Sequence, residues 1–175
     1  MKNLHIVLLG ILLLLLQNCS NTINQDKGIL DSLSVRSNEF LGEWYSVDRA
    51  TPYDAVLKID SNNSFAYEGA ACVSRFFSNG HWILNGDTLI LNSVIPQRCY
   101  YLDKFGVGCK IAKIGEPFEP LATSIRGCVP STDSVFNIFE NEKFVIKDSV
   151  LMHIPKPNNL CPDVKDDFTR IKHNN

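Results

Sequence analysis

The chain has 175 residues, with 17 Lys and Arg against 19 Asp and Glu, and 45% of its residues are hydrophobic. This length fits one domain of ordinary size. The net charge of −2 gives no basic surplus to neutralise phosphates, so the composition argues against a nucleic-acid partner. A charged fraction of 21% and ten Phe exclude an intrinsically disordered chain.

The N-terminus has the pattern of a secretory signal. Lys2 is followed by an apolar run from Ile6 to Leu16 that only Gly10 interrupts. Eleven helical residues at about 1.5 Å each cannot cross a hydrocarbon core of roughly 30 Å. A basic start followed by an apolar stretch of this length predicts a signal peptide over residues 1–18.

The sequence that ends this run resembles a bacterial lipoprotein signal, in which a Cys directly after the apolar stretch is lipidated and becomes the N-terminus. Leu16 lies three residues before Cys19, as that signal requires, whereas Gln17 and Asn18 replace its usual small residues. The resemblance implies acylation of Cys19, with palmitate among the acyl chains. Each buried CH₂ adds about 0.8 kcal/mol to membrane binding. We therefore expect a lipid anchor in the cell envelope, at the outer membrane. A secreted or periplasmic protein is the alternative.

The segment that follows Cys19 is polar and rich in Asn, Ser and Asp as far as Ser37. Such a composition predicts a tether that holds a domain away from the membrane. We expect the lipidated N-terminus and tether to cover residues 19–38 and a single folded domain to cover residues 39–175.

From Phe40 onward the apolar residues repeat with the period of two that is typical of strands. Alternating runs lie near 55–59, 65–67, 88–91, 136–138, 144–147 and 150–154. Tight turns separate them: Asp60–Asn63 is polar, and Asn85-Gly86 favours a two-residue hairpin because both positions tolerate positive φ. Short strands at such spacing predict an all-β fold, an antiparallel barrel of about eight to ten strands.

Residues 95–134 interrupt this rhythm. They hold three of the six Cys, four of the eight Pro and four of the ten Gly. About 40 residues cannot bury a core of their own without crosslinks. We expect a Cys-rich, irregular insertion in the barrel domain. Within it, Tyr100, Tyr101 and Phe105 either line a binding surface or form a small core beneath the loop, and the second is the preferred interpretation.

Two Gly-x-Trp motifs, Gly42-Glu43-Trp44 and Gly80-His81-Trp82, each open a predicted strand, and the second continues as Ile83-Leu84-Asn85-Gly86-Asp87-Thr88-Leu89. In this respect the chain resembles the lipocalin-like small β-barrel lipoproteins of Gram-negative envelopes. The resemblance covers about Phe40–Ser93 and, more faintly, Val135–Ile171. It implies that Arg170 packs on Trp44, the first-strand Trp.

These motif residues also have a purely physical interpretation. A Trp on the first strand buries a large apolar area at one end of a barrel. The preceding Gly allows close passage of the backbone, and an Arg over the indole adds about 0.5–2 kcal/mol. We therefore give Gly42, Trp44, Gly80, Trp82 and Arg170 structural roles.

The Cys residues favour disulfides over metal binding. No Cys-x-x-Cys pair occurs, so neither a zinc ribbon nor a thioredoxin-type pair is supported. An exported chain meets an oxidising compartment. We expect Cys99 to bond to Cys109 and Cys128 to bond to Cys161, which leaves Cys72 as a free, buried thiol.

No catalytic arrangement is recognisable in the sequence. Motifs for serine hydrolases, zinc proteases, phosphate-binding loops and EF-hands are all missing. His81 is expected at the surface, and His153 on the polar face of its strand. Asp166 and Asp167 are adjacent and are expected to point to opposite faces. We expect a protein without catalytic residues, metal or cofactor.

Two kinds of non-enzymatic binding function remain. The first is a carrier or sensor that holds a small apolar ligand inside the barrel, as the resemblance implies. Its interior lining would be Leu57, Ile59, Phe65, Tyr67, Leu89 and Leu91. The second is a protein-interaction or inhibitor module with a packed barrel, which binds an envelope protein through the Cys-rich insertion. Large aromatic side chains in a small barrel favour the second, whereas the lipocalin-like resemblance favours the first, with the interaction module as its alternative.

Overall fold

The computed structural model describes residues 37–47, 54–71, 74–106, 120–157 and 166–172. The chain divides into two units after Glu39, and the fold below belongs to the unit from Phe40 onward. Eleven strands lie within the described residues: β1 (Gly42–Ser46), β2 (Asp54–Ile59), β3 (Ser64–Ala71), β4 (Ser74–Asn85), β5 (Thr88–Ser93), β6 (Tyr101–Lys104), β7 (Ala122–Thr123), β8 (Val135–Ile138), β9 (Glu142–Lys147), β10 (Val150–Ile154) and β11 (Phe168–Thr169).

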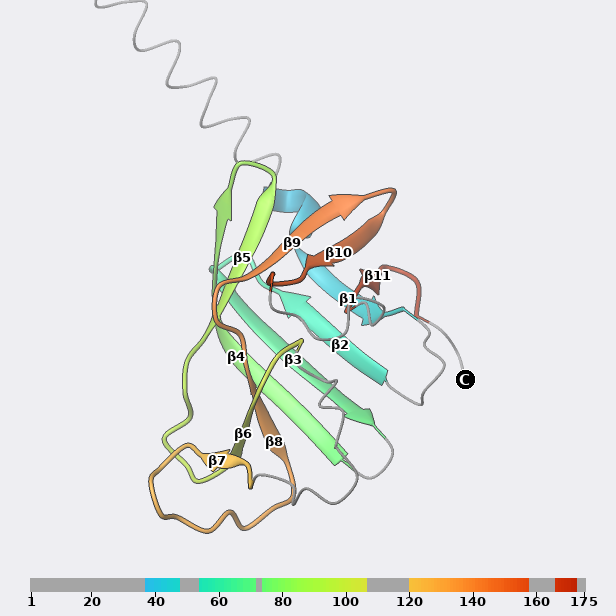
Figure 1. The fold of residues 1–175 in the computed structure, drawn as a ribbon. Coiled ribbons are helices and arrows are strands. Elements are labelled where there is room, and N and C mark those ends of the chain that lie inside the picture. The colour runs from blue at the N-terminus through green and yellow to red at the C-terminus, as the bar shows by residue number, and fades with distance from the viewer. Residues whose placement is uncertain (1–36, 48–53, 72–73, 107–119, 158–165, 173–175) are drawn as a thin grey trace, which may run out of the picture. The chain divides into compact units, whose positions relative to one another are not determined.

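Eight of these strands close into an antiparallel barrel (Figure 1). The strands β1 to β5 pair in chain order, and the sheet then continues through β9, β10 and β11 back to β1. The closing pair joins Tyr45 and Ser46 of β1 to Thr169 and Phe168 of β11. The barrel predicted from the alternating runs is confirmed, and eight strands lie within the predicted range.

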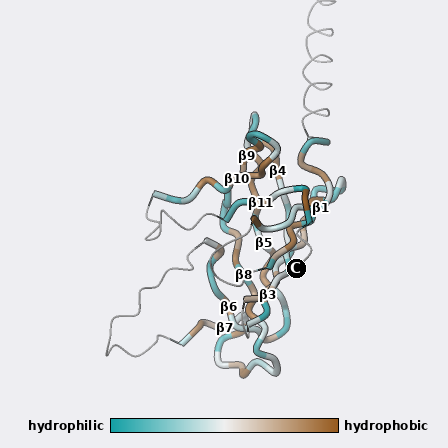
Figure 2. Tube along the Cα trace, turned by 90° about the vertical axis from the view of Figure 1, so that its right-hand side faces the viewer, coloured by the Kyte–Doolittle hydropathy of each residue, from teal (hydrophilic) through white to brown (hydrophobic). Residues whose placement is uncertain are grey.

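Alternation along the strands separates a packed interior from a polar exterior. In β2, Ala55, Leu57 and Ile59 are buried, whereas Asp54 and Lys58 between and beside them are exposed. Successive side chains of a strand point to opposite faces, so a period of two in hydropathy places one set in the core. Figure 2 shows apolar stretches along the strands and hydrophilic stretches at the hairpin turns.

The hairpin turns use the residues that tolerate positive φ. Gly86 has φ +61° in the turn between β4 and β5, and Asn63 has φ +63° between β2 and β3. Asp148 and Ser149 both have positive φ between β9 and β10, as a two-residue turn that matches the strand twist requires. These turns fix the register of the hairpins that build the barrel.

The strand β4 is longer than the sequence indicates. It begins at Ser74, so the motif Gly80-His81-Trp82 lies in its middle, and the expectation that this motif opens a strand is wrong. The first part of β4 pairs with β3 and the second part with β5. Gly80 lies where the two pairings meet, opposite Phe65 on one side and Ser93 on the other.

Within the Cys-rich insertion, two short strands lie among the irregular structure that was expected. The strands β6 and β7 form within it, and β6 pairs in parallel with β8, which pairs in parallel with β4. This parallel pairing has a simple cause. Since β5 ends at Ser93, it leaves the first part of β4 without a partner on that side, and β8 fills the place before the chain continues into β9.

Candidate functional site

Aromatic and aliphatic side chains of the described residues are buried together in the interior of the barrel. The six residues expected to line a ligand cavity, Leu57, Ile59, Phe65, Tyr67, Leu89 and Leu91, are all buried in one core cluster. The Tyr67 ring lies within 5.2–6.3 Å, centroid to centroid, of the rings of Phe76, Phe105, Phe139 and Phe168. These six residues therefore contact other side chains of the barrel.

Two of the core aromatics were missed in the sequence. Phe105 follows β6 and stacks on Phe139, which follows β8, with ring centroids 4.1 Å apart. The backbone N–H of Phe105 donates to the carbonyl of Ile138, which holds the end of the insertion against the barrel. Neither residue belongs to an alternating run, so no periodic signal marked them. Phe105 lies in the main core, and the expectation that it joins a small core beneath the loop is wrong.

The structural residues of the Gly-x-Trp motifs lie at defined positions in the barrel. The Trp44 indole N–H donates to the carbonyl of Phe40 at 2.7 Å, and the Trp82 indole N–H donates to the carbonyl of Asp60 at 2.9 Å. Both rings are buried. The guanidinium of Arg170 lies over the Trp44 ring. Gly42 has φ +104°, and a Cβ there would lie 2.8 Å from the Arg170 guanidinium, so a side chain would collide with it.

The second feature is a buried polar cluster around His153, at the end of β10. Its side chain is only 5% exposed and packs against the rings of Phe105 and Phe144. The Nε2 atom lies 3.0 Å from Glu142 Oε2, and Nδ1 lies 4.0 Å from Asp166 Oδ2. The backbone N–H of His153 donates to the Asp167 carboxylate at 2.9 Å.

This cluster corrects the expectation for His153. His153 does not lie on a polar face, because its register partner Phe144 and its neighbour Leu151 both point inward. Asp166 and Asp167 both approach His153, Asp166 at its ring and Asp167 at its backbone N–H. The antiparallel register of β9 and β10 places Glu142 beside His153, and the segment before β11 supplies the two Asp residues.

The Glu142 carboxylate is the electrostatic centre of the cluster. Burial raises the pKa of Glu142, but hydrogen bonds with His153 and Lys156, together with their charges, outweigh it and hold the pKa below its ordinary value. The Lys156 Nζ donates to Glu142 Oε1 at 2.7 Å. Glu142 on β9 is thus joined to His153 on β10 and to Lys156 just after β10. The segment before β11 contacts the same His153 through Asp166 and Asp167, so the cluster has a structural role. Among the residues that the structure describes, no group of three or more His, Cys, Asp or Glu side chains is arranged to hold a metal ion.

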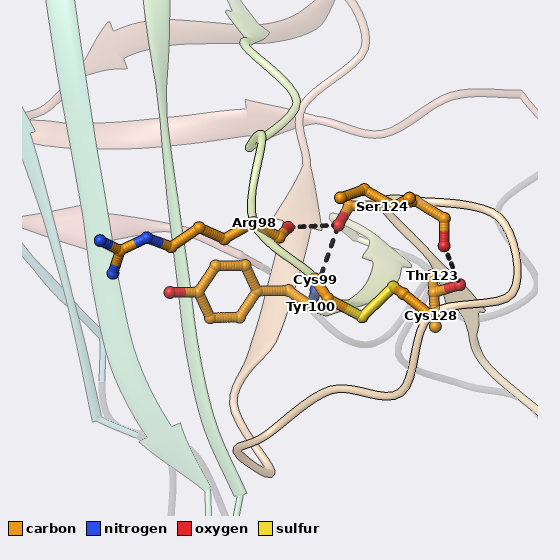
Figure 3. The surroundings of a disulfide bond; sticks show 7 residues. Arg98, Cys99, Tyr100, Thr123, Ser124 and Cys128 are labelled. Carbon is orange, nitrogen blue, oxygen red and sulfur yellow. Dashed lines mark hydrogen bonds between the residues drawn. A yellow bond between two sulfur atoms is a disulfide. The ribbon is translucent and has the colours of Figure 1, made fainter.

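The third feature is the crosslinked insertion (Figure 3). In the structure Cys99 forms a disulfide with Cys128. The predicted pairs Cys99–Cys109 and Cys128–Cys161 are therefore both wrong. Cys109 is closer than Cys128 to Cys99 along the chain, but the pairing of β6 with β7 brings Cys128 close to Cys99 in space. The Ser124 hydroxyl donates to the Arg98 carbonyl and accepts the Tyr100 backbone N–H, so the two bonded segments are also joined by hydrogen bonds.

The insertion packs on the outside of the barrel. Phe77 and Phe136 are register partners on the outer face of β4 and β8, with ring centroids 5.3 Å apart. The ring of Tyr100 lies 4.9 Å from Phe77, edge to face. Phe136 is fully buried although it does not belong to the barrel core. A second, small aromatic cluster therefore lies between the barrel wall and the crosslinked segment.

Several predicted residues lie outside the described residues: Cys19, Cys72, Cys109 and Cys161, with the signal peptide and most of the tether. Within the described part of the chain, no helix is both long and apolar enough to pass through a bilayer. Comparison with known proteins found no matching family model, no similar curated protein and no similar solved structure.

Proposed function

We propose that this protein is a non-enzymatic, lipid-anchored binding protein of the cell envelope, and that it binds another envelope protein through its crosslinked insertion. The packed interior of the barrel is the observation that supports this proposal best. The side chains that a carrier would use to enclose a ligand are buried in one core cluster, and two of them, Phe65 and Tyr67, lie against other rings. A filled barrel acts as a rigid support, and binding then falls to the surface segments that it holds.

The insertion has the properties of such a surface. Ile125 and Val129 lie on either side of Cys128 and are 46% and 86% exposed. Between them, Arg126 and Gly127 form a tight turn in which the Cys128 N–H donates to the Ile125 carbonyl. Because the disulfide and the Ser124 hydrogen bonds fix this turn in place, little conformational freedom is lost when a partner binds.

The membrane anchor is a separate part of the proposal and rests on the sequence at Cys19. Replacing Cys19 with Ser removes the thiol that would be acylated. We expect the variant to lose the mass of the acyl chains and to leave the membrane fraction. If Cys19→Ser still gave an acylated, membrane-bound protein, the lipoprotein assignment would be wrong.

The proposed binding surface can be tested by photo-crosslinking in the native envelope. A photoreactive amino acid in place of Val129 should give a discrete protein adduct. The same group in place of Lys143, exposed on β9, is the matched control and should give none. The adduct should also disappear in a Cys99→Ser/Cys128→Ser background. Equal adducts at the two positions, or an adduct indifferent to the disulfide, would contradict the proposal.

Binding of a small apolar ligand inside the barrel is the second candidate. The observation in its favour is the closed eight-stranded barrel, together with the position of Arg170 over Trp44 that the lipocalin-like resemblance implies. A ligand would have to displace or rearrange the rings around Tyr67. Its test is native mass spectrometry of the full chain, in which a small apolar molecule bound one to one would support this candidate.

A further inference from the structure

A groove of about 460 Å³ opens on the outer face of β2, β3 and β4. The register of the three strands defines its shape. One row across them contains Asp54, Ala70 and Arg75, and the next contains Val56, Glu68 and Phe77. These side chains point away from the barrel, because the residues that alternate with them, such as Leu57 and Tyr67, are buried in the core.

The floor of the groove is apolar and low. Ala70 lies between Asp54 and Arg75, and its short side chain leaves a hollow between two long ones. In the next row the apolar side chains of Val56 and Phe77 flank Glu68. An apolar floor with a few polar groups at its rim is the usual composition of a binding groove.

The groove carries three charged side chains, Asp54, Glu68 and Arg75. Among the described residues, the structure records no ion pair and no side-chain hydrogen bond for Asp54, Glu68 or Arg75. Asp54 on β2 and Arg75 on β4 lie on opposite sides of the groove, and Glu68 lies on the middle strand β3, between Val56 and Phe77. Since neighbouring strands are about 4.8 Å apart, roughly 10 Å of groove separates Asp54 from Arg75. Solvated charges on a strand often have no partner, but here opposite charges face each other across an apolar hollow.

The groove adjoins the crosslinked insertion. Phe77 forms part of its floor and also contacts Tyr100 and Phe136, the aromatic cluster beneath the insertion. Ser134, just before β8, lines its margin. A partner held by the insertion would therefore lie beside this groove.

We infer that the groove binds an extended segment of the protein partner that carries a basic, an apolar and an acidic side chain at alternate positions. This inference rests on the proposed function. Alternate residues of an extended chain share one face, and five residues span about 13 Å. The apolar side chain then lies on Ala70, the basic group reaches Asp54 and Glu68, and the acidic group reaches Arg75.

Synthetic peptides can test this inference with the full chain in detergent micelles. The probe is acetyl-Lys-Ser-Val-Ser-Glu-amide, followed by the amide NMR shifts of Val56, Ala70 and Phe77. Its controls carry Lys at both ends, Glu at both ends, or Ser in place of Val. We expect the two charge-changed controls to bind roughly three- to fivefold more weakly, which is the size of one lost surface charge pair. The Ser control keeps both charges and should bind more weakly because it loses the apolar contact with Ala70.

Charge exchange in the protein gives a sharper result. Arg75→Glu should make the groove prefer the peptide with two Lys, whereas Glu140→Lys, an exposed change outside the groove, should leave the order unchanged. Equal affinities, shifts that map elsewhere, or an unchanged order in Arg75→Glu would overturn the inference. If the peptides fail while crosslinking at Val129 succeeds, only the groove is wrong. If both fail, the proposed function is wrong as well.

Discussion

The guanidinium carbon of Arg170 lies 3.7 Å from the centre of the Trp44 ring. Its Nη1 also donates to the carbonyl of Glu43 at 3.2 Å. These contacts join the segment after β11, the last strand, to β1, the first. They lie beside the pair of strands that closes the barrel, where only two residues of each strand are in register. A side-chain contact therefore supplements a short strand pairing at the point of closure.

Arg170→Met tests the strength of this contact. The variant keeps an aliphatic chain over the indole but loses the charge and the hydrogen bond. We expect the free energy of unfolding in urea to fall by about 1–2 kcal/mol. Lys172→Met is the control, because Lys172 is exposed and lies 5.8 Å from the Tyr45 ring, and it should change stability by less than about 0.5 kcal/mol. Equal effects would show that the stacking on Trp44 contributes nothing.

Gly80→Ala should damage the barrel far more than Gly86→Ala. A Cβ at Gly80 would lie 2.0 Å from the Asn92 carbonyl oxygen and 2.7 Å from the Ser93 Cα, both of them backbone atoms that cannot move aside. We expect a loss of about 3 kcal/mol or failure to fold. At Gly86 no atom lies within 4 Å, and only the positive φ opposes a side chain, so about 1 kcal/mol is expected. Thermal unfolding of the two variants measures the difference.

The buried Glu142 should make stability depend on acid pH. Folding lowers the pKa of Glu142 below its ordinary value of 4.5, so its contribution is complete above that pH. The contribution is then lost as the pH falls through the lower, folded-state pKa. Glu142→Gln should lose roughly 2–3 kcal/mol at neutral pH and show a flatter decline between about pH 5 and pH 3. Urea titrations at each pH measure both effects. The exposed Glu140→Gln is the control, and parallel curves for wild type and Glu142→Gln would refute the assignment.

Removing the disulfide should destabilise the insertion. The bond between Cys99 and Cys128 closes a loop with a sequence separation of 29. In the chain-entropy model such a loop contributes roughly 3–4 kcal/mol. In Cys99→Ser/Cys128→Ser, we expect faster amide hydrogen exchange at Tyr101 and Leu102 of β6, with little change at the core strands β2 and β3. Exchange that rises equally in all strands would mean that the insertion and the barrel unfold as one unit.

The barrel was predictable because its signals are local. Residues such as Leu57 and Phe65 alternate with polar neighbours, and Asn85-Gly86 marks its hairpin by backbone preference alone. The polar cluster around His153 depends on the register between β9 and β10. The sequence of a single strand does not reveal that register. The turn at Asp148 and Ser149 could have revealed it: counting back from that turn pairs His153 with Phe144 and puts Glu142 on the same inward face.

The insertion was the least predictable part. Its disulfide follows from the antiparallel pairing of β6 with β7 and the parallel pairing of β6 with β8, and pairings of two and four residues leave no pattern in the sequence. Sequence distance favoured Cys109 as the partner of Cys99, whereas the fold placed Cys128 there. Short strands are fixed by the neighbours they meet, so their own sequence carries little information.

Native mass spectrometry of the full chain, extracted gently from its own envelope, tests the central claim most directly. The claim is that the barrel interior is packed with its own side chains and that binding occurs outside it. The predicted result is an acylated chain, two hydrogens lighter for each disulfide, that carries no small non-covalent companion and retains a protein partner. A small apolar molecule bound one to one would contradict the claim and make the protein a carrier.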